Sequence, residues 1–141
     1  MKKAQKNFCS KFIPIGVFFL VVLLDQMSKY WAQTMNLVVV NSGISFSIFS
    51  NLNISNNLLI ITLILLILMV MVFLLKNFSK STLLSTIFIA AAFSNLLDRI
   101  VFSGVRDWLI IPILGLKNNF ADWLMFLSII FLFIKKYKTC K

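Results

Sequence analysis

Four stretches of apolar residues, separated by short polar segments, dominate the sequence. A helix needs about 20 predominantly apolar residues to cross a hydrocarbon core roughly 30 Å thick. Three of the stretches approach that length, and the fourth is shorter and has Asp122 near its start. We therefore expect an all-α membrane protein in which residues 1–141 form a single integral membrane domain, a four-transmembrane-helix bundle. The predicted helices cover residues 12–33, 58–75, 83–101 and 120–134.

The positions of the basic residues predict how the bundle is oriented. Of the 14 Lys and Arg residues, most precede the first helix, separate the second from the third, or follow the fourth. Because basic residues collect on the cytoplasmic side of a membrane, both termini should be cytoplasmic, and residues 34–57 and 102–119 should face outward. A basic and then apolar start is also typical of a signal peptide, but no small-residue cleavage site follows, so we expect an uncleaved first helix.

Composition supports the membrane class and excludes several chemistries. The chain is 60% hydrophobic, with a mean hydropathy of +0.97, against about 45–50% apolar residues in soluble proteins. The net charge of +10 does not indicate nucleic-acid binding, because the lysines flank the apolar runs and form no basic face with exposed aromatics. There is no histidine, which rules out a Ser-His-Asp triad. Cys9 and Cys140 lie far apart and are expected to be free thiols, so we expect no metal and no cofactor.

A stripe of polar residues interrupts the third apolar run. Asn95, Asp98 and Arg99 occupy positions i, i+3 and i+4, so a helix places them on one face. Charged groups inside a membrane are costly and usually turn toward a partner or a wet cavity. This stripe is therefore a candidate functional surface.

The four acidic residues of the chain are expected at similar depth. At 1.5 Å per residue, Asp25 lies roughly 20 Å and Asp98 roughly 23 Å from the cytoplasmic edge. Asp107 falls in the second outer loop, and Asp122 falls in the first turn of the fourth helix. All four carboxylates are thus predicted in the outer third of the membrane or just above it.

Asp107 and Asp122 form a candidate catalytic pair if the outer loop folds back over the bundle. Two carboxylates at short range cannot both ionise comfortably, so they titrate as a unit that keeps one proton. The ionised member can then activate a water while the protonated member donates to the scissile carbonyl, as in aspartic proteases. Spacing in the sequence does not by itself establish that the two groups meet.

Structural interpretations stand beside the functional ones. Asp25 and Lys29 are i, i+4 partners, which a helix ion pair explains without any function. Asp98 and the adjacent Arg99 can also be interpreted as an internal ion pair that fixes the third helix against its neighbours. Asn95 can likewise hydrogen-bond a neighbouring helix.

The outer loops carry short structural signals. The β-branched run Val38–Val40 is suited to a short strand, and Asn41–Gly43 reads as a turn, which predicts a small outer-face loop or β element. In the second outer loop, Trp108–Pro112 is a short apolar segment that ends at the proline. Arg106 and Lys117 are expected to be solvated or to contact lipid headgroups.

Five sequence blocks together resemble the lipoprotein signal peptidases (signal peptidase II), small four-helix aspartyl proteases of the bacterial cytoplasmic membrane. Their order, spacing and expected topology agree with that family over residues from about 20 to 130. The blocks are Asp25-Gln26-x-x-Lys29, Asn41-x-Gly43-x-x-Phe46, Asn95-x-x-Asp98-Arg99, Val105-x-Asp107-Trp108 and Asn119-x-Ala121-Asp122.

The resemblance implies a substrate and a role for each matched residue. The substrate would be a prolipoprotein whose cysteine already carries diacylglycerol, cleaved just before that cysteine by a multi-pass enzyme whose active site lies near the outer face of the membrane. Membrane lipids are the other expected partner, and we expect a monomer. The implied catalytic residues are Asp107 and Asp122, the substrate-binding residues are Asn41, Asn95, Arg99 and Asn119, and the supporting residues are Asp25, Lys29, Gly43 and Asp98.

The chain also departs from the family pattern. Ser94 stands where the family usually has Gly, Arg106 replaces an aliphatic residue, and Trp108 replaces Phe. The main alternative function is a small transporter or ion-conducting bundle, which should carry charges at the midplane and in the cytoplasmic half. The inner halves of the four predicted helices carry none. A non-catalytic membrane adaptor is the second alternative, in which neutralising the aspartates would affect stability alone.

Overall fold

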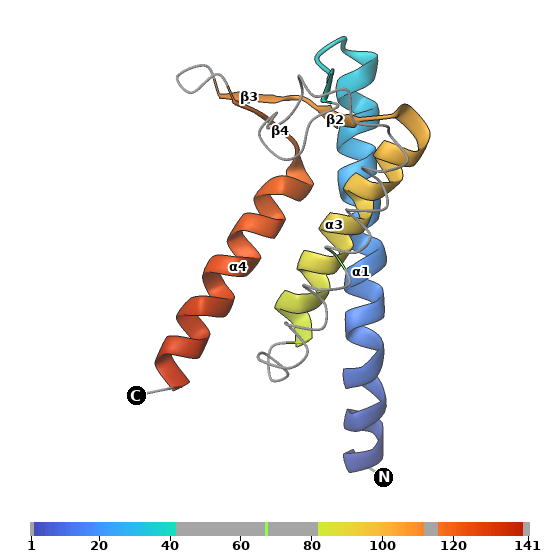
Figure 1. The fold of residues 1–141 in the computed structure, drawn as a ribbon. Helices are drawn as coiled ribbons and strands as arrows, with labels where there is room; N and C mark the ends of the chain where they lie inside the picture. Colours follow the sequence, from blue (N-terminus) through green and yellow to red (C-terminus); the bar gives the residue numbers. More distant parts are fainter. Residues whose placement is uncertain (1, 42–66, 68–81, 112–115, 140–141) are drawn as a thin grey trace.

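The computed structural model describes residues 2–41, 67, 82–111 and 116–139, with side chains from residue 12 onward. Its helices are α1 (Lys2–Thr34), α3 (Thr82–Phe102) and α4 (Phe120–Thr139). α3 packs against both α1 and α4 (Figure 1). The start of α1 and the end of α4 lie at one end of the molecule, and the short strands lie at the other (Figure 1).

Small side chains let the helices approach closely. Ala90 and Ala91 of α3 are fully buried beside Val21 of α1 and Ala121 of α4, as is common where membrane helices meet. Large apolar side chains elsewhere point outward; Phe19, for example, is 66% exposed. Such a surface suits lipid and not water.

The helices agree in part with those expected from the sequence. α3 matches the predicted 83–101 helix within one residue at each end. α1 begins ten residues before the predicted start, and α4 continues past residue 134 through the lysines to Thr139. Among the described residues, the segments Phe12–Thr34 and Thr82–Phe102 are long and apolar enough to cross a membrane. The predicted 58–75 helix lies outside the described residues, apart from Ile67.

Two small antiparallel sheets lie at the end of the helices opposite the start of α1 and the end of α4 (Figure 1). β1 (Val39–Asn41) pairs with β2 (Val105–Asp107), with Val39 opposite Asp107. β3 (Leu109–Ile111) pairs with β4 (Leu116–Asn118). The predicted strand at 38–40 is shifted by one residue, and the expectation that Asn41 opens a turn is wrong, because Asn41 continues β1. Ser42 and Gly43 lie outside the described residues.

Local backbone chemistry ends the helices where the strands must begin. After α1, Asn36 adopts a φ of 56°, and Leu37 N–H donates to the carbonyl of Ala32 (3.0 Å), which closes a Schellman motif. After α3, Ser103 has a φ of 57°. A Cβ at Gly104 would lie 2.6 Å from Val40 Cγ1. Only glycine therefore lets β1 approach this turn so closely.

Candidate active site

Asp107 and Asp122 share one hydrogen-bond donor. Asp107 ends β2, and Asp122 lies in the first turn of α4. The side-chain Nδ2 of Asn119 donates to Oδ1 of Asp107 (2.8 Å) and to Oδ2 of Asp122 (3.2 Å). These two carboxylate oxygens therefore cannot lie further apart than the sum of those distances. The structure brings together the two groups that the sequence singled out as a pair.

Asn119 can bridge the carboxylates because it is also fixed by the start of α4. Its Oδ1 accepts the backbone N–H of Asp122 at 3.0 Å, which is the hydrogen bond of a helix N-cap. Two further amides complete the arrangement. Asn41 Nδ2 donates to Oδ2 of Asp107, and Asn95 Nδ2 donates to Oδ1 of Asp122, both at 2.9 Å. Each of the four carboxylate oxygens thus accepts one side-chain amide.

The surroundings of Asp107 favour its protonated form. The side chain is almost fully buried, and burial raises the pKa of Asp107 above its ordinary value. The hydrogen bonds from Asn41 and Asn119, and the charges of Lys29 and Arg99, act in the opposite direction. Arg99 is itself buried and is attracted by Asp107 and Asp122.

Lys29 links the helices below this pair. Its fully buried Nζ contacts Oδ2 of Asp25 (2.7 Å), Oδ1 of Asn95 (2.8 Å) and Oδ2 of Asp98 (3.3 Å). The predicted i, i+4 pair of Asp25 and Lys29 is confirmed. Asp25 also accepts the backbone N–H of Ala121 at 2.8 Å, so α1 holds the first turn of α4.

Arg106 is buried, and the expectation of a solvated loop charge or headgroup contact is wrong. Its guanidinium forms an ion pair with Asp98 (2.8 Å) and lies 4.1 Å from the ring centroid of Phe102. The expected pairing of Asp98 with Arg99 is also replaced: among the described residues, the ion pairs of Asp98 are with Arg106 and Lys29. Adjacent helix positions point about 100° apart, so Arg99 and Asp98 diverge. The charge of Arg99 interacts with Asp107 and Asp122 as well as with Asp98.

Three polar residues of this network were not predicted as site residues. Gln26 Nε2 donates to Asp98 Oδ1 (3.0 Å) and to Ser94 Oγ (2.9 Å). The Ser94 hydroxyl in turn donates to Oδ2 of Asp25 at 2.7 Å. Gln33 accepts from Arg106 at 3.1 Å. The available signal was weak: Gln26 and Gln33 lie seven residues apart and so on one helix face.

The remaining predicted positions have less defined roles. Lys117 is half-buried on β4, and Gly43 lies outside the described residues. Within the described part of the chain, no three His, Cys, Asp or Glu side chains gather as a metal site requires. All four aspartates instead belong to one hydrogen-bonded network.

Comparison with known proteins identifies the family. A model of the family "Signal peptidase (SPase) II" matches residues 17–138. No curated protein matches the sequence. The fold is similar to that of a bacterial membrane enzyme determined by the in meso method at 2.3 Å, with 21% identity, a TM-score of 0.71 and coverage of 91% of this chain and 89% of that chain. A second bacterial membrane enzyme, determined at 1.9 Å, has 17% identity, a TM-score of 0.64 and coverage of 86% and 90%. The chain belongs to the signal peptidase II family, membrane proteases that remove the signal peptides of lipoproteins.

Proposed function

We propose that this protein is an aspartyl endopeptidase that cleaves diacylglyceryl-modified prolipoproteins just before the lipidated cysteine. The observation that carries the proposal is the single amide of Asn119, which donates to both Asp107 and Asp122. Carboxylates held this close titrate as a pair that retains one proton at intermediate pH. That protonation state is the one aspartic proteases use.

The reaction needs a water between the pair and the scissile bond. The ionised aspartate takes a proton from the water as its oxygen attacks the carbonyl carbon, and the protonated aspartate donates to the carbonyl oxygen. Collapse of the tetrahedral intermediate breaks the C–N bond. The departing amine takes the proton that the water gave up, and one hydroxyl of the intermediate returns a proton to the other aspartate as the new carboxyl group forms. The pair is then back in its starting state. Neither metal nor cofactor enters these steps.

The proposal also gives roles to residues around the two aspartates. Asn41, Asn95, Arg99 and Asn119 are the proposed substrate contacts, and Asp25, Lys29, Gly43 and Asp98 are the proposed supporting residues. Asn95 has both ends of its amide occupied, by Lys29 and by Asp122. Its larger contribution is therefore to orient Asp122.

The proposed setting is the bacterial cytoplasmic membrane. In this arrangement, residues 1–141 form one four-helix domain with both termini in the cytoplasm, acting as a monomer. The apolar outward surface of α1 and the placement of both chain ends opposite the strands (Figure 1) support it. A signal peptide and two acyl chains then remain in lipid, and the scissile bond reaches the outer boundary, where Asp107 and Asp122 lie.

A cleavage assay tests the proposal. Purified protein in detergent is incubated with a diacylglyceryl-modified precursor, and the unmodified precursor serves as the substrate control. Wild type should release the signal peptide from the modified precursor, while Asp107→Asn and Asp122→Asn should leave it intact. Full cleavage by either folded variant would remove the aspartate pair from the mechanism.

A further inference from the structure

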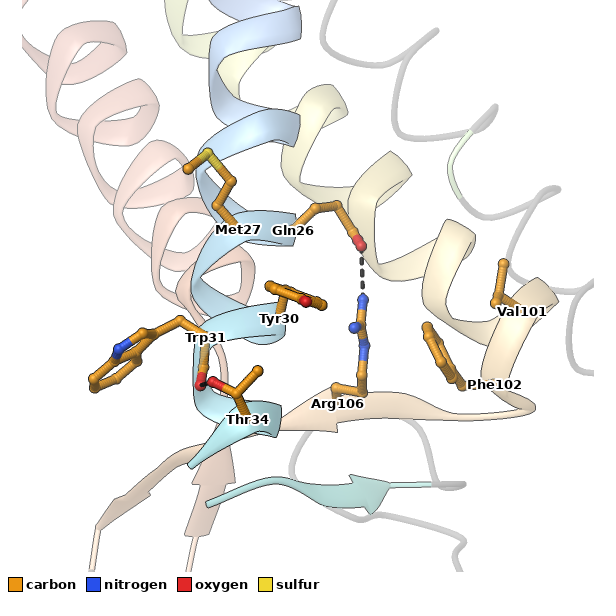
Figure 2. Close-up of a pocket in the computed structure, with 8 residues that line it drawn as sticks. All are labelled: Gln26, Met27, Tyr30, Trp31, Thr34, Val101, Phe102 and Arg106. Carbon is orange, nitrogen blue, oxygen red and sulfur yellow. Dashed lines mark hydrogen bonds between the residues drawn. The ribbon is translucent and has the colours of Figure 1, made fainter. Parts of the chain in front are cut away.

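Arg106 lies directly before Asp107 but belongs to a different set of contacts. Successive residues of a strand point to opposite faces, and all three residues of β2 are buried. Asp107 faces the amides of Asn41 and Asn119, whereas Arg106 extends from β2 toward Gln26 of α1 (Figure 2). The two faces of β2 therefore contact different parts of the protein: one meets the side-chain amides of the carboxylate pair, and the other meets α1 and α3.

The carboxylate of Asp98 accepts hydrogen bonds from both the main chain and the side chain of Arg106. Its Oδ2 accepts the Arg106 backbone N–H (3.0 Å) and Nε–H (3.3 Å), and its Oδ1 accepts Nη2–H (2.8 Å). Hydrogen bonds between a guanidinium and a carboxylate are short and geometrically specific when they are forked in this way. β2 is thus attached to α3 at the residue next to Asp107.

A second anchor joins the same guanidinium to α1. Nη2 donates to Gln26 Oε1 at 2.7 Å, and Nη1 donates to Gln33 Oε1 at 3.1 Å. Gln26 also donates to Asp98 Oδ1 at 3.0 Å, which closes a ring of three side chains. Arg106 therefore connects β2 to both helices at once.

The far side of this ring faces a groove and not the carboxylate pair. The groove has a volume of about 610 Å³, and Tyr30, Val101 and Phe102 are among the side chains that line it (Figure 2). If the guanidinium is removed, Asp98 keeps Lys29, Gln26 and the backbone N–H of residue 106 as partners. β2 loses its side-chain links to α3 and α1, and these links depend on Arg106 alone.

Both carboxylates of the pair are tied to Asp98 by separate routes. Asp107 connects to Asp98 through the backbone of β2 and Arg106. Asp122 accepts from Asn95, Asn95 accepts from Lys29, and the Nζ of Lys29 lies 3.3 Å from Asp98 Oδ2. We propose that Arg106 is a positioning residue for the cleavage reaction, and that it holds β2 at the place where Asp107 meets Asp122. This inference rests on the proposed function.

Substitution of Arg106 tests the role, with Lys117 of β4 as the matched control. Arg106→Leu removes the charge and the fork, Arg106→Lys keeps the charge alone, and Lys117→Leu removes a charge from the neighbouring sheet. We expect kcat of Arg106→Leu to fall on the order of 10²-fold, the cost of a misplacement of about 1 Å, with KM unchanged. Arg106→Lys should recover part of that loss, and Lys117→Leu should match wild type.

A spectroscopic reading does not depend on activity. Because the chain has only four acidic residues, all Asp, labelling of aspartate at Cγ gives four carboxyl carbon signals. The signal that disappears in Asp107→Asn belongs to Asp107. It should move in Arg106→Leu and stay in place in Lys117→Leu.

The outcomes separate this inference from the proposed function. Folded Arg106→Leu with wild-type kcat, or with a change in KM alone, would overturn the positioning role. If Arg106→Leu does not fold, wild-type kcat in Arg106→Lys together with an unmoved Asp107 signal would overturn it. In contrast, full activity of Asp107→Asn would overturn the proposed mechanism whatever the Arg106 variants do.

Discussion

The four aspartates of this protein lie in one network but fall into two pairs with different partners. Among the described residues, every ion pair involves Asp25 or Asp98, which contact Lys29 and Arg106 at 2.7 to 3.3 Å. Asp107 and Asp122 instead accept their hydrogen bonds from neutral side-chain amides. The first pair joins the helices, and the second lies at the end of the molecule that carries the strands.

This difference matches the proposed division into supporting and catalytic carboxylates. A cation at salt-bridge distance compensates the buried charge of a carboxylate, so Asp25 and Asp98 are suited to joining the helices. An amide N–H can donate to a carboxylate or to the unprotonated oxygen of a carboxylic acid. The Asn41, Asn95 and Asn119 amides can therefore hold Asp107 and Asp122 in place while a proton moves between them and a substrate.

The largest effect should come from neutralising either member of the amide-held pair. In Asp107→Asn and Asp122→Asn, we expect cleavage to fall on the order of 10⁴-fold, as when an essential catalytic group is disabled. Both variants should stay folded, because neither residue is part of an ion pair in the described structure. Cleavage rates and thermal unfolding of the purified proteins check this. Unfolding of both variants at ordinary temperature would erase the distinction between the two pairs.

The second largest effect should be a loss of stability when the ion-paired aspartates lose a cation. Lys29→Met leaves Asp25 and Asp98 buried with one cation fewer. Loss of one partner from a buried ion pair typically lowers the free energy of unfolding by about 3–5 kcal/mol. Adding Asp25→Asn to Lys29→Met should recover part of that loss. Unfolding of the single and double variants in detergent measures it, and equal stability of Lys29→Met and wild type would contradict it.

A smaller effect should separate the two tasks of Asn119. Asn119→Ala removes the N-cap of α4 at a cost of about 1 kcal/mol and also removes the bridge between Asp107 and Asp122. Asn119→Ser keeps a capping oxygen, but its single hydroxyl proton cannot serve both carboxylates. We expect Asn119→Ser to recover stability and not activity. Recovery of both would show that capping alone is required.

The smallest effect should be a pH dependence of stability. Burial raises the pKa of Asp107 in the folded protein, so the folded state keeps a proton that the unfolded chain releases. The contribution to stability is full below the unfolded pKa and declines as pH rises toward the folded pKa. Asp107→Asn should remove this decline. Unfolding temperatures measured across that pH range, for wild type and variant, test it; the same slope in both would contradict the assignment.

Much of this arrangement follows from local sequence, and the part that does not depends on long-range contacts. The apolar run that forms α3 and the i, i+4 spacing of Asp25 and Lys29 are local signals, and both were predicted. The pairing of Asp107 and Asp122 was a hypothesis from their expected positions, and the resemblance to a known family implied that they are catalytic. Arg106 was misjudged because its partners Gln26 and Gln33 precede it by more than 70 residues. An isolated arginine in a loop carries no sign of such partners.

Ser94 and Asn41 show the same limit. Ser94 was noted only as a departure from the glycine usual in the family, but its hydroxyl connects Asp25 to Gln26. Asn41 looked like the start of a turn, but its pairing with Val105 makes it the end of β1. In both cases the contact that decides the structure is with a residue more than 60 positions away, and local sequence patterns do not reveal it.

The central claim is that Asp107 and Asp122 are close enough to share a proton. With aspartate labelled at Cγ, the carboxyl signal of Asp107 can be followed through a pH titration in wild type and in Asp122→Asn. If the two groups are coupled, removal of the neighbouring charge should shift the titration of Asp107 to lower pH. Superimposable titration curves in the two proteins would contradict the claim.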